Sequence, residues 1–276
     1  MINASRPLLT CKSKGPVKLL CEIDLDKLLP TKGERRRFDN NWDAFLASDK
    51  NNPKIFKIHG HKLKYESEQL IPLKTDKRPP LLLVFGNPAS HSVHAGMFFA
   101  YEGNWKEHRF WKDILKPAGL LELPRISSVP ADGLNGLRRQ QLLDLGYKGP
   151  FRIGLSVFIS IPSAPGGKWG GIAGVQKLLG VKALRRLEIE ETRRIHECAQ
   201  KFIGQSGKVV IFQKNAWNSL RSEKDPEYQI DLARSGRLKG RLKHALGIEI
   251  LGVPPTRLSG PCRRILEMIT KPGATF

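Results

Sequence analysis

The sequence predicts an α/β protein, with a three-layer α/β/α arrangement around a central, mainly parallel sheet and a basic N-terminal extension. Four apolar runs, at residues 81–85, 151–161, 208–213 and 248–253, are short and rich in the residues that strands favour. Segments with helical spacing lie between these runs. Such an alternation of strands and helices favours parallel strands that are covered by helices on both faces.

The N-terminal extension is expected to cover residues 1–78, and the core residues 79–276. Residues 55–65 alternate apolar and basic side chains around His59 and His61, which is typical of a β-hairpin. Two histidines in a turn are more often solvated than bound to a metal ion, so no metal site is expected there. The excess of basic residues in this extension favours a role in guiding DNA, and packing against the core is the alternative.

The core is expected to begin with a strand at residues 81–85, since a continuous apolar run is typical of a strand buried on both faces. Helical spacing follows at residues 108–118, 137–145 and, most clearly, 183–203. Residues 234–243 carry five basic side chains and two glycines, which disfavours an isolated helix. This segment is either a patch that contacts the DNA backbone or a solvated stretch.

The charge of the chain indicates the class of its partner. Lys and Arg number 47 against 26 Asp and Glu, which gives a formal net charge of +21 and an isoelectric point near 10.1. Contacts between cationic side chains and phosphates supply most of the non-specific affinity for nucleic acid. Nucleic acid is therefore the expected partner, and an anionic membrane surface is the alternative. No apolar run approaches the ~20 residues that span a bilayer, so no membrane insertion is expected.

The cysteines and the N-terminus indicate where the protein works. None of the four cysteines, Cys11, Cys21, Cys198 and Cys262, has a partner at the close spacing of a zinc ribbon. Free thiols in a reducing compartment are the plain interpretation. The N-terminus also lacks the long apolar segment of a secretory signal. We therefore expect an intracellular protein, cytoplasmic with the nucleoid in a prokaryote and nuclear in a eukaryote.

A first motif follows the strand at residues 81–85. It begins with Gly-Asn-Pro at residues 86–88, at the carboxyl end of a buried strand, where ligand sites of open α/β sheets lie. Phe99 precedes an alanine, and Arg-Phe-Trp at residues 109–111 opens a helix. This order resembles the first motif of the uracil-DNA glycosylase superfamily, most closely that of its mismatch-specific branch.

The resemblance assigns a role to each residue of the first motif. It implies that Asn87 is the catalytic residue, which positions the attacking water. It also implies that Gly86, Pro88 and Phe99 bind the extruded base, with the ring of Phe99 stacked on it.

A second motif follows the last predicted strand, as Pro-Thr-Arg-Leu-Ser at residues 255–259. It resembles the closing loop of the same superfamily. The resemblance implies that Leu258 is a wedge that fills the place of the extruded base, and that Thr256 and Ser259 bind phosphate. Ser259 is also expected to be the N-cap of the closing helix. Three arginines add positive charge there: Arg257, Arg263 and Arg264. The alternative is a plain strand–turn–helix in which Ser259 caps the helix and Leu258 lies in the core.

Together the two motifs imply a monofunctional DNA glycosylase of base excision repair. It would flip a deaminated or mismatched base, with uracil as the first expectation, and remove it by hydrolysis. The implied partner is damaged or mismatched DNA, and we expect a monomer with no cofactor and no metal ion. No lysine is placed to form a Schiff base, so strand cleavage is not expected. His91 and His94 are either candidate bases or plain polar loop residues.

The sequence also departs from the family pattern. Phe85 and Ala89 stand where glycines are expected, and Pro254 stands where fast relatives have a histidine. No aspartate accompanies Asn87 as the base. These departures concern rate and base preference more than fold. They leave two alternatives open: a glycosylase for hypoxanthine or xanthine, and a non-catalytic nucleic-acid-binding protein with the same fold.

Overall fold

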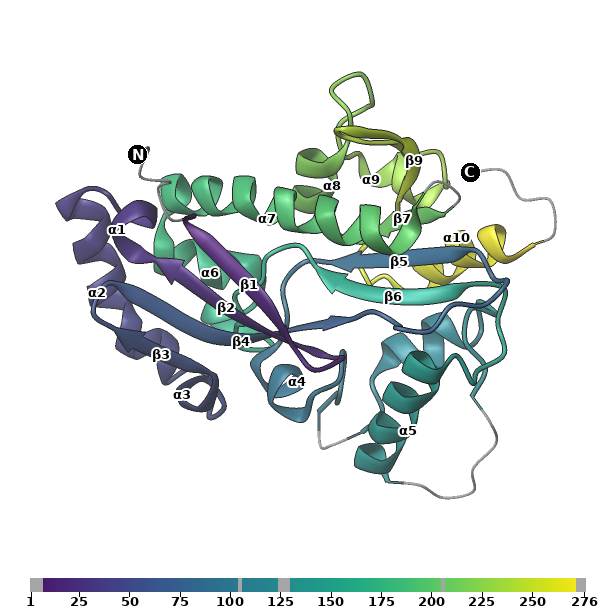
Figure 1. Ribbon diagram of the computed structural model, residues 1–276, viewed down its shortest axis with the longest axis horizontal. Helices are drawn as coiled ribbons and strands as arrows, with labels where there is room; N and C mark the ends of the chain where they lie inside the picture. The colour runs from purple at the N-terminus through teal and green to yellow at the C-terminus, as the bar shows by residue number, and fades with distance from the viewer. Residues whose placement is uncertain (1–6, 104–105, 124–129, 205–206, 272–276) are drawn as a thin grey trace.

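The computed structural model describes residues 7–103, 106–123, 130–204 and 207–271. Within these residues the chain forms one mixed β-sheet in the order β1-β2-β4-β6-β5-β7-β9-β8, and β3 pairs with β4 at one side (Figure 1). Helices alternate with the strands along the chain. The predicted α/β class is therefore confirmed.

Parallel strands form the centre of the sheet: β6 (Arg152–Val157), β5 (Pro80–Phe85), β7 (Lys208–Ile211) and β9 (Ala245–Gly252). They lie side by side in this order, and β8 (Lys239–Leu242) adds an antiparallel edge next to β9. Of the eight pairings between described strands, three are parallel and five are antiparallel. The prediction of a mainly parallel sheet is thus right for its centre and wrong for the whole, because N-terminal strands join the sheet.

The N-terminal residues supply the antiparallel flank: β1 (Leu9–Lys14), β2 (Lys18–Asp24), β3 (Phe56–His59) and β4 (Lys62–Leu70). The β3–β4 pair confirms the predicted hairpin, whose turn is at Gly60 with a φ of +59°. The last two residues of β4 pair with β6, so this flank is continuous with the central strands. Residues expected to stand ahead of the core therefore extend its sheet.

The helices fall between and beside the strands. They are α1 (Leu25–Leu28), α2 (Lys32–Leu46), α3 (Asn52–Ile55), α4 (Ser90–Ala95), η1 (Phe110–Leu115), α5 (Ala131–Asp144), η2 (Gly167–Trp169), α6 (Gly171–Leu179), α7 (Val181–Ile203), α8 (Lys214–Leu220), α9 (Ile230–Arg234) and α10 (Ser259–Thr270). The predicted helix at 183–203 is confirmed as α7. The one expected at 108–118 contains only η1, a short π-helix. None of the described helices is long and apolar enough to cross a membrane.

Each face of β5 packs into a different hydrophobic cluster. Leu82 and Val84 belong to the cluster that also holds residues of α6 and α7. Leu83 and Phe85 belong to the cluster that holds residues of η1 and α10. Successive side chains of a strand point to opposite faces, and all of β5 is buried, as the continuous apolar run predicts.

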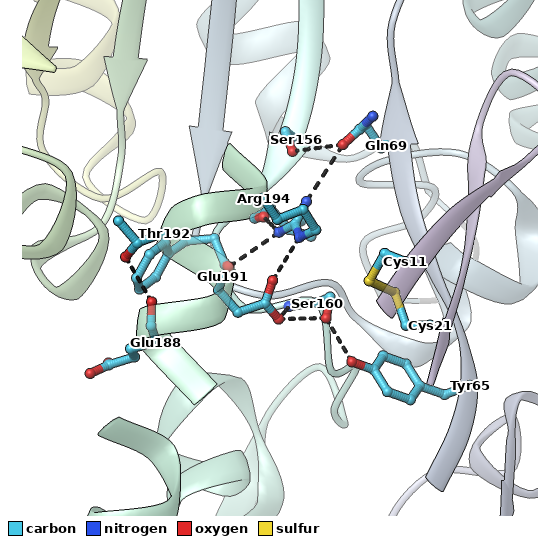
Figure 2. Close-up of polar contacts among 12 residues, drawn as sticks. Cys11, Cys21, Tyr65, Gln69, Ser156, Ser160, Glu188, Glu191, Thr192 and Arg194 are labelled. Atoms are coloured by element: carbon cyan, nitrogen blue, oxygen red, sulfur yellow. Dashed lines mark hydrogen bonds and ion pairs between the residues drawn. A yellow bond between two sulfur atoms is a disulfide. The ribbon is translucent and has the colours of Figure 1, made fainter. Parts of the chain in front are cut away.

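A buried polar network ties α7 to the strands (Figure 2). The Glu191 carboxylate accepts a hydrogen bond from Arg194 Nε at 2.6 Å, and others from the backbone N–H and the hydroxyl of Ser160. Ser160 Oγ and the Tyr65 hydroxyl of β4 are hydrogen-bonded at 2.7 Å. Arg194 also donates to the backbone carbonyl of Val157 at the end of β6. Every oxygen of Glu191 thus has a partner in the protein.

Cys11 and Cys21 are directly opposite each other in the β1–β2 pair and form a disulfide, with their Cα atoms 4.2 Å apart (Figure 2). The expectation of free thiols is wrong for this pair, and it is confirmed for Cys198 and Cys262, which are free and buried. The pairing depends on the register of a hairpin that the sequence did not indicate. The cysteines therefore no longer support the inference of a reducing compartment.

Candidate active site

A cavity of about 940 Å³ lies where the carboxyl ends of β5 and β6 meet helix α4 and the loop before α10. Residues of both predicted motifs border it. Asn87, Pro88 and Phe99 come from the first motif, and Thr256 and Arg257 come from the second. Two segments from opposite ends of the core, each singled out in the sequence, thus meet at one site.

Asn87 is held by its amino group. Its Nδ2 donates to the backbone carbonyl of Ile161 at 3.2 Å and to Ser163 Oγ at 2.9 Å. The Ser163 carbonyl in turn accepts from Ser90 N at 2.9 Å, which fixes the loop after β6 against α4. No described residue donates to Asn87 Oδ1. The side chain therefore presents a carbonyl oxygen, which can accept a hydrogen bond from water.

Gly86 is not among the residues that line the cavity. A Cβ atom at this position would lie 3.0 Å from the side chain of Gln213, and the Gly86 carbonyl accepts from Ile159 N at 2.8 Å. Gly86 thus has a packing role, and its contact with a base stays a prediction. The small residue lets the loop after β5 approach the end of the neighbouring strand β7.

Phe99 has an unusual backbone conformation. Its φ is +49°, in the left-handed region that residues other than glycine rarely adopt. Trp111 Nε1 donates to the Phe99 carbonyl at 3.1 Å and holds this conformation. The half-buried ring lies 4.9 Å from Phe85 and 4.3 Å from Phe110, measured between ring centroids. The aromatic cluster thus fixes the ring at the wall of the cavity, where a planar ligand can stack on it.

Three histidines border the cavity: His91, His94 and His108. Burial lowers the pKa of His91, and the nearby carboxylate of Asp49 opposes this shift. Burial also lowers the pKa of His108 to about 4, and Glu102 opposes this shift. His108 Nδ1 accepts from the backbone N–H of Phe110 at 3.1 Å, which fixes its ring. His91 and His108 are therefore neutral at pH 7.

The second motif is only partly at the cavity. Thr256 and Arg257 line it, whereas Leu258, Ser259 and Arg263 are not among its lining residues. Helix α10 begins at Ser259, and Leu258 occupies the N-cap position without a side-chain hydrogen bond. The prediction that Ser259 caps this helix is therefore wrong: its hydroxyl lies in the first turn, one residue too late.

Leu258 does not fit the alternative of a plain strand–turn–helix, in which its side chain would lie in the core. The half-buried side chain of Leu258 belongs to neither hydrophobic cluster of the described residues, so it is not a core residue. Arg263 is exposed and its Nε lies 3.2 Å from the Glu267 carboxylate, one helical turn further along α10. A pair of this kind between exposed groups is weak, and it leaves Arg263 able to exchange its partner for a phosphate.

Glu68 of β4 is a cavity residue that the sequence did not indicate. Its side chain borders the cavity although the residue is only 4% exposed. Its Oε2 has no hydrogen-bond partner among the described residues. Burial raises the pKa of Glu68 well above its ordinary value of 4.5. Burial therefore favours the protonated form of this carboxyl group.

The chain matches no protein-family model, and a search of curated proteins finds no match. Among the described residues, no group of three or more His, Cys, Asp or Glu side chains is arranged to hold a metal ion. The function must therefore be argued from the residues of the cavity themselves.

Proposed function

We propose that this chain is a monofunctional DNA glycosylase that flips a deaminated or mismatched base, uracil in the first place, and removes it by hydrolysis. The observation that carries the proposal is that both motifs border one cavity, which is lined by Asn87 and Phe99 from the first motif and by Thr256 and Arg257 from the second. We also infer a three-layer α/β/α domain, with the basic residues 1–78 as a DNA-guiding extension. The protein would act as a monomer inside the cell.

In the proposed reaction the base stacks on Phe99, and the attacking water donates a hydrogen bond to Asn87 Oδ1. The bond between the sugar C1′ and the base nitrogen breaks, and its electron pair leaves with the base. The water oxygen adds to C1′, and the proton that water loses neutralises the base. An amide is too weak a base to remove that proton early, so bond cleavage runs ahead of water attack. The neutral imidazole of His91 can relay the proton.

The second motif would grip the DNA while the base is out of the helix. Leu258, which has no place in the core, would fill the space that the base leaves. Thr256 and Ser259 would bind phosphate, and the exposed Arg257 and Arg263 would neutralise the backbone charge. The formal net charge of +21 supports this role, since phosphate contacts dominate affinity for DNA.

The test is single-turnover cleavage of labelled oligonucleotides that carry uracil, thymine opposite guanine, hypoxanthine or xanthine, each followed by alkali. Purines belong in the panel because a cavity of about 940 Å³ has room for a bicyclic base. Each oligonucleotide is offered as single and double strands. Wild type is compared with Asn87→Ala and with Asn41→Ala, an asparagine on α2 away from the cavity.

The expected result is an alkali-dependent break at one base that Asn87→Ala slows by about 100-fold or more and Asn41→Ala leaves unchanged. Leu258→Ala is expected to slow cleavage of double-stranded substrate more than that of single-stranded substrate. Tight DNA binding without an abasic product on any substrate would reject the enzyme and leave a nucleic-acid-binding protein.

A further inference from the structure

Glu68 of β4 lies level with the carboxyl ends of the central strands β6 and β5. The β4–β6 pairing ends where Gln69 is opposite Ser156, and continuing this antiparallel register by one residue brings Glu68 level with Val157. Val157 is paired with Phe85 in the parallel register of β6 and β5. Residues that are opposite each other in a sheet point to the same face. Glu68 therefore follows two apolar residues in this row, and on its other side the row continues with Lys18 of β2, whose Nζ is paired with Glu66 at 2.8 Å.

This row forms one wall of the cavity. Phe85, Val157 and Glu68 all border it, and the ring of Phe99 packs edge-on against that of Phe85. Neighbouring strands are ~4.8 Å apart, so Glu68 lies roughly 10 Å across the sheet from Phe85. A nucleobase that stacks on Phe99 has dimensions that fit this distance.

No hydrogen bond or ion pair among the described residues explains why a glutamate is buried at position 68. A buried polar group is costly unless it is hydrogen-bonded, and Oε2 has no partner among the described residues. The neighbouring acid on the same face, Glu66, is instead paired with Lys14 and Lys18 at 3.0 and 2.8 Å. The cavity is the direction from which a partner for Glu68 can come.

We propose that Glu68 binds the hydrogen-bonding edge of a nucleobase held in this cavity, giving one hydrogen bond to a ring carbonyl and accepting one from the adjacent ring N–H. This inference rests on the proposed function and names how that site recognises its substrate. A protonated carboxyl group carries one donor and one acceptor side by side. Uracil, hypoxanthine and xanthine each carry the complementary carbonyl and N–H.

The carboxyl group can present its donor and acceptor in either order. Glu68 therefore selects bases with an adjacent donor and acceptor, and it does not by itself distinguish uracil from cytosine. Its second effect is on the departing base. The hydrogen bond to the carbonyl strengthens as negative charge develops on the base, which supplies the electrophilic help that Pro254 cannot give.

The test uses free bases, so that it does not depend on catalysis. Binding of 1-methyluracil and of 1,3-dimethyluracil, in which the N–H is blocked, is measured by calorimetry or NMR titration. A matched purine pair is 9-methylhypoxanthine and 1,9-dimethylhypoxanthine. The proteins are wild type, Glu68→Gln, Glu68→Leu and the control Glu66→Leu. The amide in Glu68→Gln keeps a donor and an acceptor, whereas the side chain in Glu68→Leu has neither.

We expect Glu68→Leu to weaken binding of the base with a free N–H by about 10-fold or more. Glu68→Gln and Glu66→Leu should stay within about threefold of wild type. The blocked base keeps its carbonyl acceptor but cannot donate to Glu68, so Glu68→Leu should weaken its binding less than that of the free base. Failure of wild type to bind either free base, or an equal loss for free and blocked bases in Glu68→Leu, would overturn the inference.

The two proposals fail in different ways. If wild type excises a base from DNA but Glu68→Leu binds free bases like wild type, the glycosylase stands and the role of Glu68 is rejected. If base binding depends on Glu68 but no oligonucleotide yields an abasic site, the base-binding role of Glu68 stands and the enzyme is rejected.

Discussion

Two glutamates are buried among the residues that the structure describes, and they differ in whether their carboxyl groups have hydrogen-bond partners. Glu191 of α7 is fully buried, and both of its oxygens accept hydrogen bonds, from Arg194 and from Ser160 (Figure 2). Glu68 of β4 is 4% exposed, borders the cavity and leaves Oε2 without a partner in the described chain. Burial alone therefore does not tell a structural acid from a functional one. The partners of the carboxyl group make the distinction.

The difference has a physical meaning. An acid whose bonds are all satisfied inside the protein stabilises the arrangement of its partners, and breaking such a network leaves a buried charge behind. An acid without partners destabilises the fold, and it persists where a ligand completes its bonds. Glu191 should therefore matter for stability and Glu68 for binding, and each of the following predictions tests that division.

The largest expected effect is on Glu191. Glu191→Ala should lower the free energy of unfolding by about 3–5 kcal/mol, because it leaves the guanidinium of Arg194, whose side chain is 11% exposed, without its counter-ion. Urea denaturation followed by circular dichroism measures the change. The matched control is Glu190→Ala on the same helix, whose partner Arg193 is exposed, and it should cost less than about 1 kcal/mol. Equal losses in both variants would show that the Glu191 network is not structural.

Substitution of Glu68 should change stability in the opposite direction from substitution of Glu191. Glu68→Leu should raise the free energy of unfolding by about 1–3 kcal/mol, since it replaces an unpartnered buried carboxyl with an apolar side chain beside Val157 and Phe85. The same urea titration measures this gain. Glu66→Leu, on the same face of β4 but paired with lysines, should bring no gain. A loss of stability in Glu68→Leu would mean that Glu68 has a structural partner after all.

The pH dependence of stability sharpens the contrast. Because burial raises the pKa of Glu68 above 4.5, the folded protein keeps a proton that the unfolded chain releases. The stabilisation that comes from this bound proton is fully present below pH 4.5 and is lost as the pH rises. The free energy of unfolding should fall by at most about 1.4 kcal/mol per pH unit. Glu68→Gln does not titrate at this position, so its stability relative to wild type should grow as the pH rises above 4.5. Parallel stability curves would show that Glu68 ionises normally.

The sequence predicts the central strands and α7 because patterns within each segment indicate them. Continuous apolar runs marked β5 and β7, and helical spacing marked α7. The first two strands were missed for different reasons. In β1 only Leu9 is buried. In β2 the buried residues alternate, but the exposed Leu20 is also apolar and hides this alternation in the sequence. Their pairing depends on contacts with the rest of the sheet, and the sequence shows no period that indicates it. The disulfide was missed for the same reason.

The site was predicted only where it lies on motifs. Asn87, Phe99, Thr256 and Arg257 were named from short patterns next to strand ends, and they do border one cavity. Glu68 carries no such pattern. In β4 the alternation of buried and exposed residues breaks at residues 67–68, where the strand passes from the flank into the sheet. A glutamate in an alternating strand looks like a solvent-facing residue until the pairing with β6 is known.

The smallest expected effect is at the far end of the Glu191 network. Ser160 donates its single hydroxyl hydrogen to Glu191, so Tyr65 must be the donor in the Tyr65–Ser160 bond. Tyr65→Phe keeps the buried ring and removes only this donor. It should lower the free energy of unfolding by about 1 kcal/mol, the usual net worth of one hydrogen bond between neutral groups.

The loss of stability in Tyr65→Phe should depend on Glu191, because Ser160 is hydrogen-bonded to both residues. In the Glu191→Ala background the Ser160 hydroxyl is free to turn, so the loss on removing the Tyr65 hydroxyl should change by more than the ~0.5 kcal/mol expected of independent sites. The double-mutant cycle is measured by urea denaturation. The control is Tyr228→Phe, which changes a half-buried tyrosine outside the network. Additive losses would mean that Tyr65 and Glu191 stabilise the fold separately. Coupling would show that Tyr65, Ser160 and Glu191 stabilise the fold as one unit.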